Sequence, residues 1–226
     1  MEVQSEIISF HSKSSPAHSV TKYPTEWKPQ TEENVLVELD EHSSERIRIE
    51  SMLTETMSKA QILSIKRIQN KWLWERYSQH KERMHKKNAG TVNEKELWHG
   101  SRNSRADNIY ASEEGFDMRY SSEGLWGQAN YFAEKASYSD AYAFRSGNGA
   151  RELLLAKVLT GDSYDCPPDS SLRMPPEKPK HSSVSGVHLK QLRFDSVTGV
   201  TNNCRVYMTY SNDKAYPAYL ISYFPA

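Results

Sequence analysis

The sequence predicts an α+β protein, with helices concentrated in the N-terminal part and an antiparallel β body after them. Three observations lead to this prediction. The chain has 226 residues, which is enough to bury one substantial core. Apolar residues recur at helical spacing before residue 90. Short strand-like runs dominate after residue 95.

The expected domain organisation is a flexible tail over residues 1–22 and one domain over residues 23–226. The tail is rich in Ser, His and Lys and lacks apolar periodicity. It has no apolar segment typical of a signal peptide, and no run in the chain approaches about 18 apolar residues, so no membrane span is expected. The two cysteines, Cys166 and Cys204, are expected to be idle or buried thiols, which fits a cytoplasmic or nuclear location.

Strands and helices alternate in the predicted N-terminal part. Val35, Val37 and Leu39 occupy alternate positions, which is typical of a strand. The helix after it is expected to be capped by Ser44 and to bury one apolar face. That face consists of Ile49, Met52, Leu53 and Met57. A strand over residues 62–68 and a helix over residues 72–87 complete this part, and the turn at Asn88-Ala89-Gly90 ends the helix.

The predicted β body consists of short strands at residues 96–99, 152–160, 205–210 and 216–224. Between Tyr164 and Lys190 the sequence has five prolines and many serines, which predicts a long surface loop. Loops of this length inside a domain are often functional.

The charge balance argues against one class of partner. Lys and Arg number 29, as do Asp and Glu, so the formal net charge is zero. A neutral chain has no long-range attraction for nucleic acid or an anionic membrane, so neither partner is indicated. The mixed run from His80 to Lys87 is interpreted as a solvated helix face rather than a nucleic-acid patch. No Cys and His pair has zinc spacing, so no metal site is expected.

The first candidate site is His99-Gly100-Ser101, where a predicted strand ends in a histidine and a glycine. Glycine leaves the backbone uncovered, so its N–H and C=O can both face a ligand. A primary carboxamide offers donors and an acceptor that match such a peptide group. Alone, the tripeptide is also typical of an ordinary turn at the end of a strand.

The second candidate site combines Tyr131-Phe132-Ala133 with Ser139 and Tyr142. Ser139 and Tyr142 are three positions apart, so on a helix they would share a face and present a hydroxyl and a ring side by side. Taken singly, the first segment is also typical of a strand in the core. The second pair alone is also typical of an ordinary amphipathic helix.

Together, the order and spacing of these segments closely resemble the catalytic domain of the poly(ADP-ribose) polymerase superfamily. Further stretches resemble its mono-ADP-ribosylating branch, at residues 65–70, 93–97, 194–197 and 215–221. The resemblance extends over about residues 23–224. It implies the ADP-ribosyltransferase fold, with an antiparallel β body, flanking helices and a helix-rich N-terminal part, and it implies NAD as co-substrate.

The resemblance also implies a role for each candidate residue. The backbone of Gly100 would hold the nicotinamide carboxamide, and Ser139 would add a third bond to that amide. Nicotinamide would stack between Tyr131 and Tyr142. On the ribose of the adenosine side, the implied ligands are His99, which also steadies the amide, and Ser101 beside it.

The third catalytic position of the family determines product length. Counting back from Ala215-Tyr216-Pro217 places it at Val206, whereas polymerising members have a glutamate there. Valine cannot accept a proton or polarise a sugar hydroxyl, but a protein carboxylate is already charged and needs no base. The resemblance therefore implies a His99, Tyr131, Val206 set that transfers single ADP-ribose units to protein acceptors, with the chain itself a candidate, and that binds nicotinamide-like inhibitors.

Two departures from the family pattern leave alternatives open. Ala129 stands where the family usually has a second glycine, and Val206 is smaller than the Ile or Leu of active mono-transferases. A catalytically weak or inactive NAD-binding module is the main alternative, although His99 is present together with Ser139 and Tyr142. A polymerase is the second alternative, and Val206 opposes it.

Overall fold

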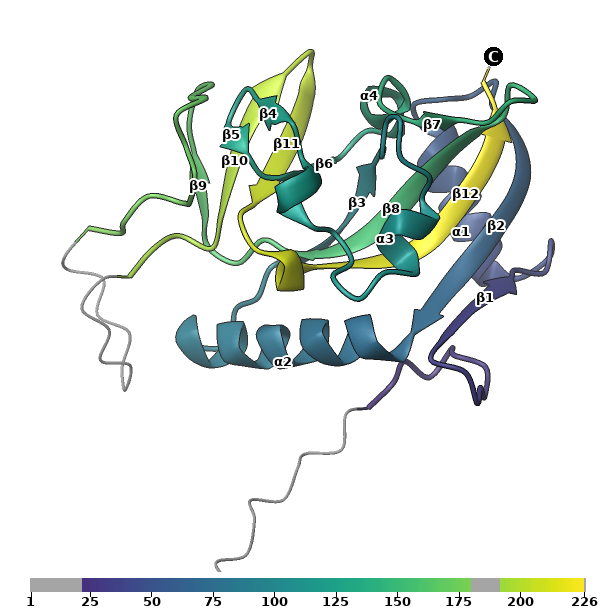
Figure 1. Cartoon of the computed structure of the whole chain (residues 1–226), viewed down its shortest axis with the longest axis horizontal. Helices are drawn as coiled ribbons and strands as arrows, with labels where there is room; N and C mark the ends of the chain where they lie inside the picture. Colours follow the sequence, from purple (N-terminus) through teal and green to yellow (C-terminus); the bar gives the residue numbers. More distant parts are fainter. Residues whose placement is uncertain (1–21, 180–191, 226) are drawn as a thin grey trace, which may run out of the picture.

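A long sheet forms the body of the molecule in the computed structural model, which describes residues 22–179 and 192–225 (Figure 1). Its strands follow the order β1-β2-β12-β8-β3-β6-β11-β10-β9, β7 pairs with β8 outside this path, and β4 and β5 form a small hairpin. In chain order the strands are β1 (Asn34–Glu38), β2 (Gln61–Asn70), β3 (Glu94–His99), β4 (Glu123–Gly124), β5 (Gly127–Gln128), β6 (Asn130–Ala133), β7 (Phe144–Arg145), β8 (Arg151–Leu159), β9 (Ser163–Asp165), β10 (Ser196–Thr201), β11 (Cys204–Thr209) and β12 (Ala215–Phe224).

The long sheet has two halves that are joined at a narrow point. β3 pairs with β8 along its whole length, but with β6 only through Trp98 and Ala133. On one side of this join lie β1, β2, β12, β8 and β3, and on the other lie β6, β11, β10 and β9. The pairings are antiparallel, as predicted, except that β9 runs parallel to β10. The two halves are thus linked by one residue pair, close to the C-terminal ends of β3 and β6.

Two helices pack against the first half of the sheet. They are α1 (Ser44–Thr54) and α2 (Lys71–Lys87), and the predicted apolar face of α2 is confirmed, since Leu73, Tyr77 and Met84 are buried. The side chain of Asn70 caps α2 by accepting the Leu73 N–H at 3.0 Å. The shorter helices are α3 (Asp107–Tyr110), α4 (Ala136–Asp140) and the 3₁₀ turns η1 (Met118–Tyr120) and η2 (Asn212–Lys214).

The structure corrects both ends of α1. Ser43, not Ser44, is the cap, because Ser43 has the extended backbone of a capping residue and its hydroxyl accepts the N–H of Arg46 at 3.2 Å. The helix ends at Thr54, so Met57 lies beyond it, although Met57 still packs against the core.

The expected helix-rich N-terminal part is not what the structure shows. α1 and α2 alternate with β1 and β2, and both strands belong to the long sheet. β2 also pairs with β12, from the other end of the chain. The N-terminal part therefore supplies both helices and strands, and its strands belong to the long sheet. It is not a separate helical layer.

The four strands predicted in the second half are present as β3, β8, β11 and β12, with ends shifted by one or two residues. The loop predicted between Tyr164 and Lys190 is wrong at its start, because Tyr164 and Asp165 belong to β9 and pair with β10. Residues 180–191 of that loop lie outside the described residues. So does the expected tail, apart from Lys22, whose carbonyl accepts a hydrogen bond from the Trp74 indole at 3.0 Å.

Buried apolar side chains form three clusters around the sheet. The largest joins α1 and α2 to the first half of the sheet and contains Tyr77 and Trp98. A second contains Phe116 and Phe132, and a third contains Val206. Of the helices within the described residues, none is long and apolar enough to cross a membrane.

Candidate active site

The candidate residues gather at the join between the two halves of the sheet. His99 ends β3 in one half, and Tyr131 lies in β6 of the other half. α4, which contains Ser139, contacts both of these strands. Val206 lies in β11, the strand next to β6. The narrow join therefore brings together residues that are more than 100 positions apart in the sequence.

The imidazole of His99, at the end of β3, is held by residues of β6 and by Phe116. Its Nδ1 lies 2.8 Å from the carbonyl oxygen of Tyr131. Its ring stands edge-on to Phe116 at 5.0 Å between centroids and lies tilted against Phe132 at 5.5 Å. These aromatic neighbours shield the ring from water, and burial lowers the pKa of His99 below its ordinary value, while the bond to Tyr131 opposes this shift.

These contacts determine which ring nitrogen faces a ligand. A carbonyl oxygen only accepts, so Nδ1 of His99 must carry the hydrogen. With a lowered pKa the ring is neutral at pH 7, and Nε2 then carries a lone pair. His99 therefore presents a hydrogen-bond acceptor, which suits a sugar hydroxyl as the donor.

Gly100 packs directly against the backbone of the segment that contains Ser139 and Tyr142. A Cβ atom at position 100 would lie 2.6 Å from the carbonyl oxygen of Ser139 and 2.5 Å from that of Tyr142. Real Cβ atoms do not approach so closely, so only glycine fits here without a shift of this backbone. The N–H of Arg102 also donates to the Tyr142 carbonyl at 2.7 Å, which fastens the loop after β3 to the same segment.

Ser139 and Tyr142 lie in consecutive turns, but α4 is shorter than predicted. It ends at Asp140, and Tyr142 lies just past it, where its N–H donates to the Ser139 carbonyl at 2.9 Å. This bond spans three residues, so the expected spacing is preserved by a 3₁₀-type turn rather than by a longer helix. Ser139 is buried and Tyr142 is half-buried.

Tyr131 is held rigidly at its phenol end. Its hydroxyl donates to the Gly127 carbonyl at 2.7 Å and accepts the N–H of Trp126 at 2.9 Å. Gly124 lies against the ring, since a Cβ atom there would come within 2.8 Å of Cζ of Tyr131. Burial raises the pKa of Tyr131 to about 12, so the phenol stays protonated and the ring direction is fixed by two bonds.

Val206 is fully buried and lies on the same face of the sheet as Tyr131. It is opposite Ala133, and Met208 is opposite Tyr131. Residues opposite each other in an antiparallel pair share a face, and so do alternate residues of a strand. Val206 also belongs to an apolar cluster with Ala129. Ala129 has a negative φ and is buried, so its methyl group fits the loop without backbone strain.

Ser101, the remaining candidate residue, uses its hydroxyl within its own loop. It follows Gly100, and its hydroxyl donates to the carbonyl of Ser104 at 2.7 Å. A hydroxyl that donates one hydrogen bond can still accept others.

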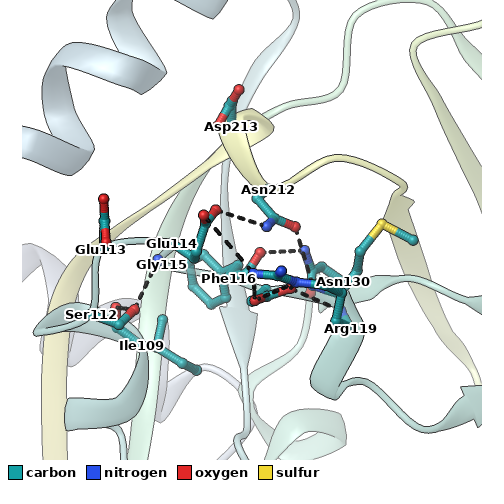
Figure 2. A network of polar contacts seen from close by, with 12 residues as sticks. Ile109, Ser112, Glu113, Glu114, Gly115, Phe116, Arg119, Asn130, Asn212 and Asp213 are labelled. Atoms are coloured by element: carbon teal, nitrogen blue, oxygen red, sulfur yellow. Dashed lines mark hydrogen bonds and ion pairs between the residues drawn. The ribbon is translucent and has the colours of Figure 1, made fainter.

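A polar network fixes the wall of the site beside His99 (Figure 2). The wall segment, residues 112–128, carries Phe116 onto the His99 ring. The amide of Asn130 donates to the Phe116 carbonyl at 2.8 Å, and Asn212 accepts the N–H of Met118 at 3.2 Å. Asn212 also donates to Glu114 at 3.2 Å, so β6 and the turn before β12 both hold this wall in place.

Sequence reasoning missed the residues that anchor α4. The carboxylate of Asp140, one residue after Ser139, accepts hydrogen bonds from Arg151 in β8 and Tyr223 in β12. Both side chains of the ion pair are about four-fifths buried. No local pattern indicates these partners, because they lie 11 and 83 positions away.

A hollow of about 220 Å³ opens beside Tyr142. Tyr138, Cys204 and Lys135 also line it. Cys204 and Val206 are two positions apart in β11, so they face the same side. The hollow therefore lies between Tyr142 and the start of β11, the strand that contains Val206. Within the described residues no group of three or more His, Cys, Asp or Glu side chains is arranged to hold a metal ion.

Comparison with known proteins identifies the family. A profile described as the poly(ADP-ribose) polymerase catalytic domain matches residues 43–224. The chain belongs to this family. It is 34% identical over 212 residues to a probable poly [ADP-ribose] polymerase of Dictyostelium discoideum, and the match covers 89% of this chain and 57% of that protein.

Relatives named as mono-transferases match the domain as well. The human protein mono-ADP-ribosyltransferase PARP14 is 30% identical over 205 residues, which are 88% of this chain and 11% of that protein. The mouse protein mono-ADP-ribosyltransferase PARP12 is 29% identical over 214 residues, which are 91% of this chain and 28% of that protein. The chain thus spans less than two thirds of the length of each of these relatives.

Proposed function

We propose that this domain transfers single ADP-ribose units from NAD to protein acceptors, itself included, and releases nicotinamide. The observation that carries this proposal is the assembly at the join of the sheet. His99 is bonded to Tyr131, Val206 lies on the same face as Tyr131, and Gly100 abuts Ser139. Relatives that are named protein mono-ADP-ribosyltransferases support the same reaction.

The nicotinamide end of NAD fits the pair of turns around Gly100. In this proposal the peptide of Gly100 offers an N–H and a carbonyl to the carboxamide, and the hydroxyl of Ser139, whose backbone packs against Gly100, supplies a third bond. Tyr142 and Tyr131 supply rings for stacking, and the two bonds to the Tyr131 hydroxyl keep its ring in one orientation. A rigid ring loses little entropy when a ligand stacks on it.

In this proposal, His99 and Ser101 bind the ribose on the adenosine side of NAD. The neutral imidazole offers Nε2 as an acceptor for a ribose hydroxyl, since Nδ1 is committed to Tyr131. Ser101 supplies a second acceptor beside it. Alignment of the sugar is the contribution of these residues, because holding reactants in a productive geometry removes much of the entropic barrier.

Val206 supports transfer of one unit rather than a chain. Its side chain is fully buried among apolar neighbours, so nothing at this position removes a proton from a sugar hydroxyl. A carboxylate of an acceptor protein is already a charged nucleophile and needs no such help. The hollow between Tyr142 and Cys204 is the route we assign to that acceptor side chain. A cytoplasmic or nuclear setting suits the two free thiols, Cys166 and Cys204.

The direct test is incubation of the purified chain with NAD labelled in the adenine part, with heat-denatured protein as the control. We expect label to become attached to the native protein and free nicotinamide to appear in step with it. Thermal stabilisation by NAD without attached label would instead assign the domain to binding without turnover. If NAD neither labelled nor stabilised the protein, this result would contradict the assignment of an NAD site.

A further inference from the structure

The guanidinium of Arg102 lies over the ring of Tyr142, at 4.4 Å from the ring centroid. Its backbone is held in the same place, since its N–H donates to the Tyr142 carbonyl at 2.7 Å. The φ of Arg102 is +54°, a left-handed value that residues with side chains seldom adopt. Such a conformation persists when surrounding contacts impose it, and it is frequent at functional sites. The backbone of the loop after Ser101 therefore holds the Arg102 side chain against the Tyr142 ring.

The charge of Arg102 has no compensating carboxylate among the ion pairs of the described residues. Its loop neighbour Arg105 is paired with Asp107 at 2.9 Å. The acidic residue nearest to Tyr142 in the sequence, Asp140, is paired with Arg151. The other cation beside Tyr142, Lys135, donates to a neutral carbonyl, that of Asn203, at 2.6 Å. The surroundings of the Tyr142 ring are thus positively charged.

A tyrosine ring has two faces, and Arg102 covers one of them. A nicotinamide ring stacked on the other face would lie about 3.5 Å beyond the tyrosine ring, which places it roughly 8 Å from the guanidinium. In NAD the nicotinamide ring carries a positive charge. When the bond between N1 of nicotinamide and C1′ of the ribose breaks, its electron pair stays on N1 and the ring becomes neutral. The positive charge moves to the ribose, where the acceptor oxygen forms the new bond to C1′.

Building on the proposed function, we propose that Arg102 makes the site discriminate against the cationic nicotinamide ring in favour of the neutral one. Arg102 acts through the opposite face of Tyr142 and does not touch the substrate, so it is a positioning residue that also sets charge preference. It opposes the charge of the bound ring before cleavage, and this repulsion is relieved as the ring leaves. Interactions that improve between ground state and transition state raise the rate of the chemical step.

The size of this effect follows from Coulomb's law. Two unit charges about 8 Å apart in a strongly solvated setting repel by an amount equivalent to roughly a two- to tenfold change in affinity. Arg102 is exposed, so salt screens the repulsion, and the effect should be smaller at about 1 M salt than at about 0.05 M salt.

The test compares two ligands that lack phosphates, nicotinamide and 1-methylnicotinamide, because a diphosphate would itself attract an arginine. The first ring is neutral and the second is a permanent cation of nearly the same shape. Calorimetry should show that Arg102→Gln shifts the ratio of the two affinities roughly two- to tenfold toward the cation. Arg102→Lys should keep the preference of the wild type, since it keeps the charge. Arg105→Gln, in the same loop, is the matched control and should leave the ratio unchanged.

The ratio separates a charge effect from mere support of the ring, because loss of support would weaken both ligands alike. An unchanged ratio in Arg102→Gln, with both ligands still bound, would overturn the role of Arg102 and leave the nicotinamide site standing. If both ligands bound Arg102→Gln more tightly by the same factor, the role of Arg102 would also be overturned. Arg102 would then cover the face of Tyr142 on which the ligand itself stacks. If the wild type bound neither ligand, the nicotinamide site itself would be wrong, and this role would fall with it.

Discussion

Nδ1 of His99 is committed to the Tyr131 carbonyl, so Nε2 is the ring atom left for a ligand. The His99→Ala variant should lose transfer activity by about 100-fold or more, because the ribose is no longer aligned. Burial lowers the pKa of His99, so the neutral ring persists into acid, and the acid limb of the wild-type rate should lie below pH 6.5.

Initial rates of label transfer measure this effect, and circular dichroism verifies the fold. His85→Ala is the matched control, because His85 is an exposed histidine on α2. This substitution should leave the initial rate of label transfer unchanged. An undiminished rate in folded His99→Ala would remove His99 from the mechanism.

Tyr142 is half-buried and its backbone is bonded to Ser139 and Arg102, so its ring can be deleted without removing the backbone bonds that hold this segment. Tyr142→Ala should weaken the binding of nicotinamide or benzamide by about 1–3 kcal/mol, on the scale of base stacking on aromatic side chains. Calorimetry on both proteins checks this. Equal affinities would mean that the ligand stacks elsewhere.

At the scale of elements, α4 depends on its anchors. A helix of five residues is not stable alone, so its position is set by the bonds from Asp140 to Arg151 and Tyr223. Asp140→Asn keeps the shape but removes the charge, and we expect nicotinamide to bind about 1 kcal/mol more weakly while the protein stays folded.

The matched control for Asp140 is Glu177→Gln, which breaks an exposed ion pair with Arg193 outside the named strands. It should leave nicotinamide affinity unchanged. Wild-type affinity in Asp140→Asn would show that α4 is held by packing alone.

Elements with a strong local pattern could be predicted from the sequence, and those defined by distant partners could not. α2 was predictable because Leu73, Tyr77 and Met84 repeat at helical spacing. β9 was not, since it is three residues long and owes its existence to β10, more than 30 positions later. The end of α4 was missed because a 3₁₀ turn preserves the same three-residue spacing as a helix.

The candidate site shows the same division. The residues His99, Tyr131 and Val206 came from resemblance and counting, and the structure places them together. Their contacts could not be read from the sequence, because Tyr131 binds His99 through a backbone carbonyl that any residue would offer. The position of Arg102 over Tyr142 left no sequence signal either, since it depends on a left-handed backbone.

At the scale of the whole molecule, the half-buried His80 on α2 should make stability depend on pH. Burial, followed by the charge of Lys214, lowers the pKa of His80 to about 4. As pH falls from 6.5 toward 4, the unfolded chain binds a proton here and the folded chain does not. Stability is therefore lost over this window, by up to about 1.4 kcal/mol per pH unit for this group.

Urea unfolding at several pH values between 7 and 4.5 measures this loss. His80→Gln should flatten the dependence, and His85→Gln on the exposed side of α2 should not. Part of the slope should remain in His80→Gln, because the lowered pKa of His99 acts in the same direction. Identical slopes in His80→Gln and the wild type would contradict the assignment to His80.

Transfer of one ADP-ribose unit is the central claim, and product length tests it most directly. The wild type should be incubated with labelled NAD, and the modified protein should be digested with phosphodiesterase. We expect AMP to be released and ribose-phosphate to stay on the protein. Val206→Glu should not create a polymerase, because it places a charge in a fully buried apolar cluster and should reduce folding or activity instead. Release of phosphoribosyl-AMP, which comes only from internal units of a chain, by the wild-type product would contradict the claim.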